Sequence, residues 1–172
     1  MNSEACQADS VNQINQFVHV VLTRFNVRTE FSQDSVPDAV WLTHRFQLFD
    51  RFAFPAMSHQ VVKNFVWFVF LDKETPRPFR DKMQVYANEC QNMVPVYVES
   101  IKIGTPENLA LLRPLIAPHM NDQTTHLIST RFDNDDAVSD EFLATIQTQF
   151  TAQTFEFINL PNGYLWQNNK LY

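Results

Sequence analysis

Glycine is almost absent from this chain, since only 2 of its 172 residues are glycine. The phosphate-binding loops of dinucleotide-binding folds and of P-loop proteins need several glycines at fixed spacing. Neither the G-x-G-x-x-G pattern nor the G-x-x-x-x-G-K-[ST] pattern occurs in the sequence. Any bound phosphate must therefore be held by a metal ion, by side chains or by a helix N-terminus.

Cysteine, positive charge and long apolar runs are also scarce. Cys6 and Cys90 are far apart and form no metal-binding or redox motif, which suits a reducing compartment. The net charge is −6 without an offsetting basic cluster, so a nucleic-acid partner is disfavoured. The longest apolar run, 65–71, is too short to cross a bilayer. Residues 1–16 lack a signal-peptide core and are predicted to be a flexible lead-in. We expect a cytoplasmic protein with no transmembrane segment, and peripheral membrane contact stays open.

The chain does contain apolar segments that alternate with helical patterns. The helices are expected to begin near Ser35, Thr75, Thr105 and Ser139. Pro55 is expected to end the first helix, and Pro114 to end or kink the third. The alternation predicts an α/β fold with a mostly parallel sheet flanked by helices. The predicted strands are 17–22, 65–71, 94–98, 125–130 and 155–160.

Two details refine this expectation. Pro95 removes a backbone donor from the third strand, which predicts a place near a sheet edge. Residues 164–166 and 171–172 are predicted to form the arms of a hairpin around a turn at 167–170. Because the second arm has only two residues, we expect a truncated chain or one that something else completes.

Three carboxylates follow the fourth predicted strand within four residues. Asp133, Asp135 and Asp136 repel one another unless a cation lies between them. Carboxylate oxygens suit Mn²⁺ or Mg²⁺, and ligands of open α/β sheets bind at the carboxyl ends of strands. The sequence thus predicts a metal–nucleotide site with an Asp-x-Asp core. The alternative is a solvated acidic turn before a helix. We call residues 133–136 the acidic loop.

The other strand ends support the first interpretation. Parallel strands deliver their carboxyl ends to one edge, which we call the carboxyl rim. Arg24, Asp72, Glu99 and Arg131 all lie at such ends. Carboxylates there would hold a metal ion and ribose hydroxyls, while arginines would meet phosphate. No two histidines have the spacing of metal ligands. His19 and His126 lie inside predicted strands, where we expect them to be hydrogen-bonded residues of the core or rim.

Three segments carry a resemblance to a known family. VVLTRFNVR at 20–28 resembles the first strand and turn of GT-A-fold glycosyltransferases, and FVFLD at 68–72 resembles their second strand. STRFDNDD at 129–136 resembles their Asp-x-Asp loop. Together with WLTHRF at 41–46, the chain most resembles the putative rhamnosyltransferase family of bacteria. The resemblance covers 17–172 and implies the nucleotide-sugar-binding part of a GT-A (Rossmann-like) domain.

This resemblance implies roles for particular side chains. A nucleoside-diphosphate sugar would be the donor, Mn²⁺ or Mg²⁺ would bridge its diphosphate, and the metal would act as a Lewis acid. Asp72 would accept hydrogen bonds from the base or ribose. The implied donor-binding residues are Thr23, Arg24, Asp72, Arg131 and Asp133. The implied metal ligands are Asp133, Asp135 and Asp136.

The family pattern also places functions beyond these segments. Inverting GT-A enzymes carry their acceptor site and their general base, an Asp or Glu, in the C-terminal half. From the resemblance we expect this chain to lack that half, so the sequence predicts neither the catalytic base nor the saccharide acceptor. Rhamnose as the transferred sugar follows from the resemblance alone.

Two other functions stay open. The chain could be an inactive donor-binding remnant, as the incomplete hairpin suggests. It could instead be a metal-dependent phosphohydrolase, because Asp72 and the acidic loop could supply carboxylates to two ions. An EF-hand is excluded, since Ala144 stands where that loop needs a bidentate Glu.

Overall fold

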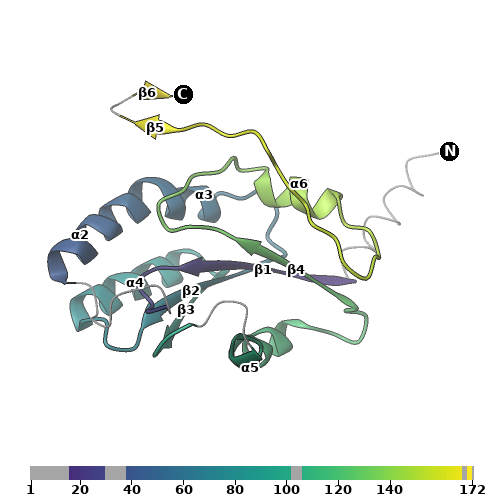
Figure 1. Ribbon diagram of the computed structural model, residues 1–172, viewed down its shortest axis with the longest axis horizontal. Coiled ribbons are helices and arrows are strands. Elements are labelled where there is room, and N and C mark those ends of the chain that lie inside the picture. Colours follow the sequence, from purple (N-terminus) through teal and green to yellow (C-terminus); the bar gives the residue numbers. More distant parts are fainter. Residues whose placement is uncertain (1–15, 30–37, 102–105, 168–169, 172) are drawn as a thin grey trace.

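A computed structural model describes residues 16–29, 38–101, 106–167 and 170–171. Its centre is a four-stranded parallel sheet in the order β3-β2-β1-β4 (Figure 1). The sheet confirms the predicted α/β, Rossmann-like fold. The strands are β1 (Phe17–Arg24), β2 (Val66–Asp72), β3 (Met93–Val98) and β4 (His126–Arg131). The helices are α2 (Ala39–Leu48), α3 (Phe54–Ser58), α4 (Arg77–Glu89), α5 (Pro106–Ile116) and α6 (Phe142–Thr148).

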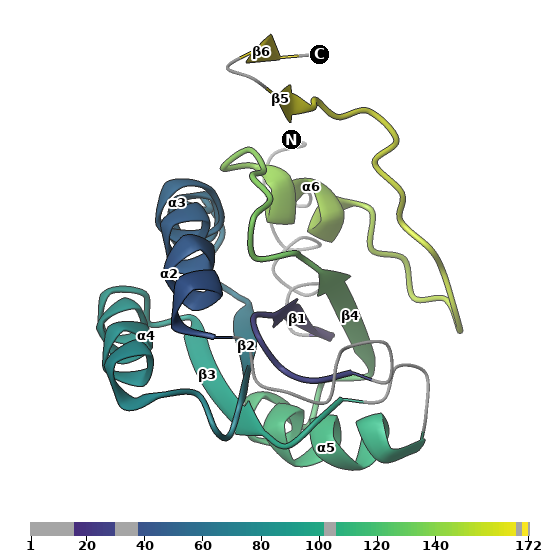
Figure 2. The ribbon, with the colours of Figure 1, turned by 60° about the vertical axis from the view of Figure 1, so that its left-hand side comes forward.

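Helices cover both faces of the sheet, and the strand period decides which face each residue serves. Trp67, Val69 and Leu71 of β2 pack into one cluster with residues of α2, α4 and α6. Phe68 and Phe70, which point the other way, pack with α5. Figure 2 shows α5 alone on its side of the sheet. Burial on both faces explains why these strands read as continuous apolar runs.

The first helical stretch differs from the prediction in its end. Asp38 caps α2 by accepting a hydrogen bond from the Trp41 N–H at 2.8 Å, while Ser35 lies outside the described residues. The helix passes through a π-helical segment, η1 (Phe49–Ala53), into α3. Pro55 therefore does not end it, so that prediction was wrong. Proline is tolerated because it stands in the first turn of α3, directly after the wide turn of η1.

Three further predictions concerned single residues at the ends or edges of elements: Pro114, Ser139 and Pro95. Pro114 lies inside α5, which continues to Ile116 and then into a 3-10 turn, η2 (Ala117–His119). Ser139 does not cap α6, because that helix begins at Phe142 with no side-chain cap. Pro95 does lie in an edge strand, as predicted, because β3 pairs only with β2 in the sheet. The expected start at Thr105 falls outside the described residues.

The largest difference between the predicted and the observed secondary structure lies in the last part of the chain. Residues 155–160 form no strand and are mostly exposed. A strand needs a paired neighbour, and this segment has no ladder with β4. A hairpin is present as predicted, but its arms are β5 (Trp166–Gln167) and the antiparallel β6 (Lys170–Leu171), so residues 167 and 170 lie in the arms rather than in the turn, and 164–165 form no strand. Figure 1 shows it lying away from the parallel sheet.

Candidate functional site

The carboxyl rim gathers segments that are far apart in sequence. β1 ends at Arg24, β2 at Asp72 and β4 at Arg131, and these strands are neighbours in the sheet. The chain builds β2 and β3 on one side of β1 and then places β4 on the other side. Open α/β sheets bind ligands at such a reversal, outside the carboxyl ends of the strands. The acidic loop follows β4 at this point.

Asp72 is fully buried, and both of its carboxylate oxygens have partners. Arg28 donates from Nε to Oδ2 at 2.7 Å, and the Glu74 N–H donates to Oδ1 at 2.8 Å. A second contact of Arg28, to the Glu74 carboxylate, is longer at 3.8 Å. The Asp72 side chain thus ties the turn after β1 to the end of β2. Its predicted contact with a base or ribose stays a prediction, and Arg28 lies between Asp72 and solvent.

A neutral network supports this ion pair, and sequence reasoning missed it. The buried Asn26 donates from Nδ2 to the Thr75 hydroxyl at 2.9 Å and accepts at 3.3 Å from the Asp72 N–H. The Thr75 hydroxyl also donates to the Asp72 carbonyl at 2.7 Å. Their only signal in the sequence is position, since both follow apolar strands.

Thr23 faces the interior. Its hydroxyl donates to the Phe132 carbonyl at 2.7 Å and accepts from the Trp67 indole at 2.8 Å. The side chain is fully buried. Thr23 therefore joins β1 to the chain after β4 from inside the core. Its implied role in donor binding stays a prediction, and this geometry assigns it a structural task.

Asn134 holds the acidic loop against the end of β1. Its Nδ2 donates to the carbonyl oxygens of Arg24 and Phe25 at 3.2 and 2.8 Å. The same side chain accepts at 3.2 Å from Nη1 of Arg45, which comes from α2. Sequence reasoning left Asn134 as the unspecified middle residue of Asp-x-Asp, but its burial shows that it fixes the loop.

Arginines accompany two of the three carboxylates of the loop. Arg45 Nη1 lies 2.5 Å from Asp135 Oδ2, and its guanidinium lies 5.2 Å from the centre of the Trp41 ring. Arg131 contacts Asp133 through Nη2 at 3.0 Å. The third carboxyl, Asp136, has its pKa raised by burial and by the nearby charges of Asp133 and Asp135, against a smaller opposite effect of Arg131. The loop thus retains excess negative charge.

Comparison with known proteins identifies the family. Residues 19–169 match the family model described as "Putative rhamnosyl transferase". The chain belongs to this family. The match confirms the resemblance and spans every predicted site residue. No curated protein and no solved structure matches the chain. Membership in the rhamnosyl transferase family supports glycosyl transfer in general terms.

The acidic loop carries oxygen donors, but its described side chains are not arranged around a metal ion. The donor set in the acidic loop is all oxygen, which suits a hard divalent cation, and its excess negative charge favours one. Within the described ranges, however, no group of three or more His, Cys, Asp or Glu side chains is arranged to hold a metal ion. The chemistry fits Mn²⁺ or Mg²⁺, and the ion pairs to Arg45 and Arg131 take up carboxylate oxygens in this arrangement.

Arg24 differs from the other arginines of the carboxyl rim. It is half-buried and forms no ion pair with any residue that the structure describes. Its backbone carbonyl is held by Asn134, so the residue is fixed beside the acidic loop. An arginine without a carboxylate partner is the one best suited to bind an anionic group.

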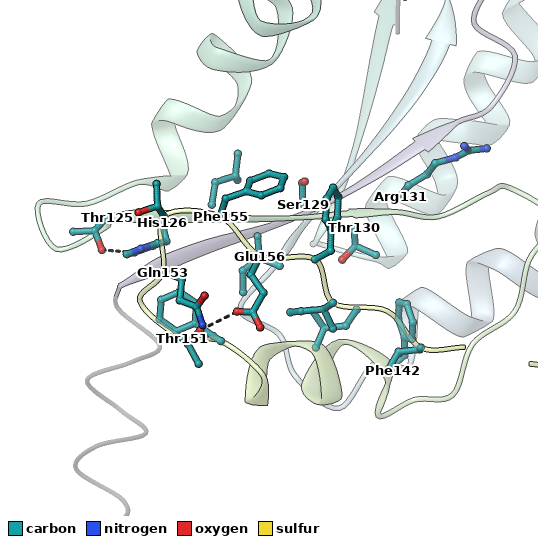
Figure 3. A pocket seen from close by; sticks show the side chains of 18 residues that line it. Thr125, His126, Ser129, Thr130, Arg131, Phe142, Thr151, Gln153, Phe155 and Glu156 are labelled. Carbon is teal, nitrogen blue, oxygen red and sulfur yellow. Dashed lines mark hydrogen bonds between the residues drawn. The ribbon is translucent and has the colours of Figure 1, made fainter. Parts of the chain in front are cut away.

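A cavity of about 680 Å³ lies elsewhere, along the outer edge of β4. Figure 3 shows side chains of β4, of α6 and of the segment after it around this space. Arg131 is the one predicted donor-binding residue among those that line it. The cavity therefore adjoins the carboxyl rim without occupying it. Separately, no helix of the described ranges is long and apolar enough to cross a membrane.

Proposed function

We propose that this chain binds the nucleoside-diphosphate sugar donor of a glycosyltransferase at the carboxyl rim, next to β1, β2 and β4. One observation carries the proposal. The turn after β1, the end of β2 and the acidic loop are joined there by direct side-chain contacts, although 44 to 110 residues separate the partners. Membership in the rhamnosyl transferase family supports the reaction class.

The charges at the rim suit such a donor. Asp133, Asp135 and Asp136 would hold Mn²⁺ or Mg²⁺ as oxygen ligands. When bound, the cation would neutralise charge on the departing nucleoside diphosphate. Arg24 is the arginine available for the phosphates, and Asn134 keeps the acidic loop beside it. The sugar would follow the phosphates outward from the sheet. We assign no general base among the described residues.

The proposal is tested by thermal unfolding of the purified protein with UDP, GDP or dTDP, each with Mn²⁺ or with EDTA. Ligand at a hundred times its Kd stabilises the native state by about 2.7 kcal/mol. We expect one nucleotide at that concentration to raise the Tm by roughly 5–11 °C, only when metal is present. Asp135→Asn should abolish this increase. Asp140→Asn removes an exposed carboxylate outside the acidic loop and is the matched control.

Two results would contradict the proposal in different ways. A Tm increase that is indifferent to EDTA and to Asp135→Asn would show nucleotide binding without the predicted metal site. A cooperative transition that no nucleotide shifts would show a folded domain without a working donor site, and would favour the inactive remnant. Hydrolysis of a generic phosphodiester with Mn²⁺ would favour the phosphohydrolase instead.

A further inference from the structure

Arg28 is a partly exposed group at the carboxyl rim that contacts the end of β2. Asp72, the last residue of β2, is fully buried and both of its oxygens are occupied. The Arg28 side chain covers that carboxylate and is 22% exposed. A ligand over β1 and β2 would therefore meet the guanidinium before it could meet the Asp72 carboxylate.

The guanidinium is held by Asp72, and its terminal nitrogens have no hydrogen-bond acceptor among the described residues. A guanidinium carries five N–H groups in one plane, and Arg28 uses Nε for Asp72. Neither of its terminal nitrogens donates a hydrogen bond to a residue that the structure describes, because the Glu74 carboxylate is 3.8 Å away. Burial of Asp72 and the Asn26–Thr75 network hold the pair rigidly. A rigid planar donor with free N–H groups is suited to directional recognition.

The local charge excludes phosphate as the preferred partner. Arg28 and Asp72 neutralise each other, and the half-exposed Glu74 adds one negative charge. A diphosphate would be repelled here and attracted to Arg24, the last residue of β1, which has no described carboxylate partner. The free N–H groups instead suit a neutral acceptor, such as the carbonyl oxygen of a nucleobase.

We propose that Arg28 donates a hydrogen bond from its terminal nitrogens to a carbonyl oxygen of the donor's base, and that Asp72 is its positioning residue. The inference rests on the proposed donor site and adds its base specificity. Uracil, thymine and guanine carry carbonyl oxygens that can accept this bond, whereas adenine carries none. The chain should therefore discriminate against adenine nucleotides.

The test compares affinities for UDP, dTDP, GDP and ADP by calorimetric titration with Mn²⁺. We expect the wild-type protein to bind at least one of the first three about tenfold more tightly than ADP, because a site built to hydrogen-bond rejects an analogue without the acceptor. Arg28→Lys keeps a cation beside Asp72 but loses the planar fork. It should remove the preference and change the affinity for ADP by less than about twofold.

Removing Arg28 alone would leave the buried Asp72 charge unpaired, which destabilises the fold. The second variant is therefore Arg28→Met combined with Asp72→Asn, which removes both charges together. Its thermal transition is measured first, and the same loss of preference is expected. Asp81→Asn, which removes a charge from an exposed pair with Arg77 on α4, is the control and should retain the preference.

The outcomes separate this inference from the proposed function. Equal wild-type affinity for all four nucleotides, or a preference that survives in Arg28→Lys, would overturn the role of Arg28 while leaving the donor site intact. An equal loss for every nucleotide, ADP included, would mean that Arg28 contacts the diphosphate and would also overturn it. If no nucleotide binds with metal, the proposed function fails and the inference fails with it.

Discussion

His19 shows how a single titratable group can make the stability of this protein depend on pH. It is buried in β1, where Gln147 Nε2 donates to its Nδ1 at 3.2 Å. Nε2 must then carry the proton and donate to the Thr130 hydroxyl at 2.9 Å. This confirms the expectation of a hydrogen-bonded core histidine. Burial lowers the pKa of His19 from 6.5 to about 4.

We expect the free energy of unfolding to fall as the pH decreases from about 6.5 to about 4, because the unfolded chain binds a proton at His19 that the folded chain does not. The full effect is roughly 3 kcal/mol, and it is absent above the unfolded pKa. Urea unfolding at pH 7, 6 and 5 measures it. His19→Asn should flatten this dependence. An unchanged dependence in the variant would assign it to other groups.

At the scale of elements, the first helical stretch depends on its cap. The helix begins with the Asp38 carboxylate accepting a hydrogen bond from the Trp41 N–H. The stretch then supplies Leu42, Phe46 and Phe49 to the core and presents Arg45 to the acidic loop. Stability of the helix start is therefore coupled to the geometry of the candidate site.

Asp38→Ala should lower the free energy of unfolding by about 1 kcal/mol, because it leaves a helix N–H without its acceptor. Asp38→Asn keeps an acceptor oxygen and should cost only a few tenths, about 0.3 kcal/mol. Chemical denaturation of the three proteins measures the difference. Equal losses for both variants would show that charge at the helix N-terminus, rather than the capping hydrogen bond, stabilises this end.

At the scale of the whole molecule, stability is unevenly distributed. The parallel sheet and its helices bury their apolar side chains, whereas the segment after α6 is exposed. The rings of Phe155 and Phe157 pack edge to face with their centroids 4.8 Å apart, yet the two residues are 74% and 85% exposed. Such a segment opens at low free-energy cost and exposes apolar surface.

Brief digestion with chymotrypsin should therefore cut after Phe155, Phe157 or Tyr164 before it cuts after buried aromatic residues such as Phe46. Mass spectrometry of the first fragments gives the positions. Phe155→Ser with Phe157→Ser should slow the cleavages in that segment. Early cutting after Phe46 or Trp67 would mean instead that the core itself opens under native conditions.

The four parallel strands, the helices between them and the acidic loop could be predicted from the sequence, because they follow from local patterns. Apolar runs of strand length and helical spacing act within a few residues. The run 155–160 shows the limit: it has the composition of a strand, but a strand exists only with a paired neighbour, and none is present. Pro55 likewise predicts the end of a helix, but the π-helical segment η1 before it places Pro55 in the first turn of α3, where proline is tolerated.

The pairing of charged side chains, in contrast, depends on the folded chain. The partners Arg28 and Asp72 are 44 residues apart, and Arg45 and Asp135 are 90 apart, so no local pattern predicts either pair. Burial of Asp72 and Thr23 likewise depends on packing between strands that meet only in the folded sheet. Composition indicated which residue types reach the carboxyl rim. Their hydrogen bonds arise from the close approach of distant segments, and that approach leaves Arg28 partly exposed while Asp72 is buried.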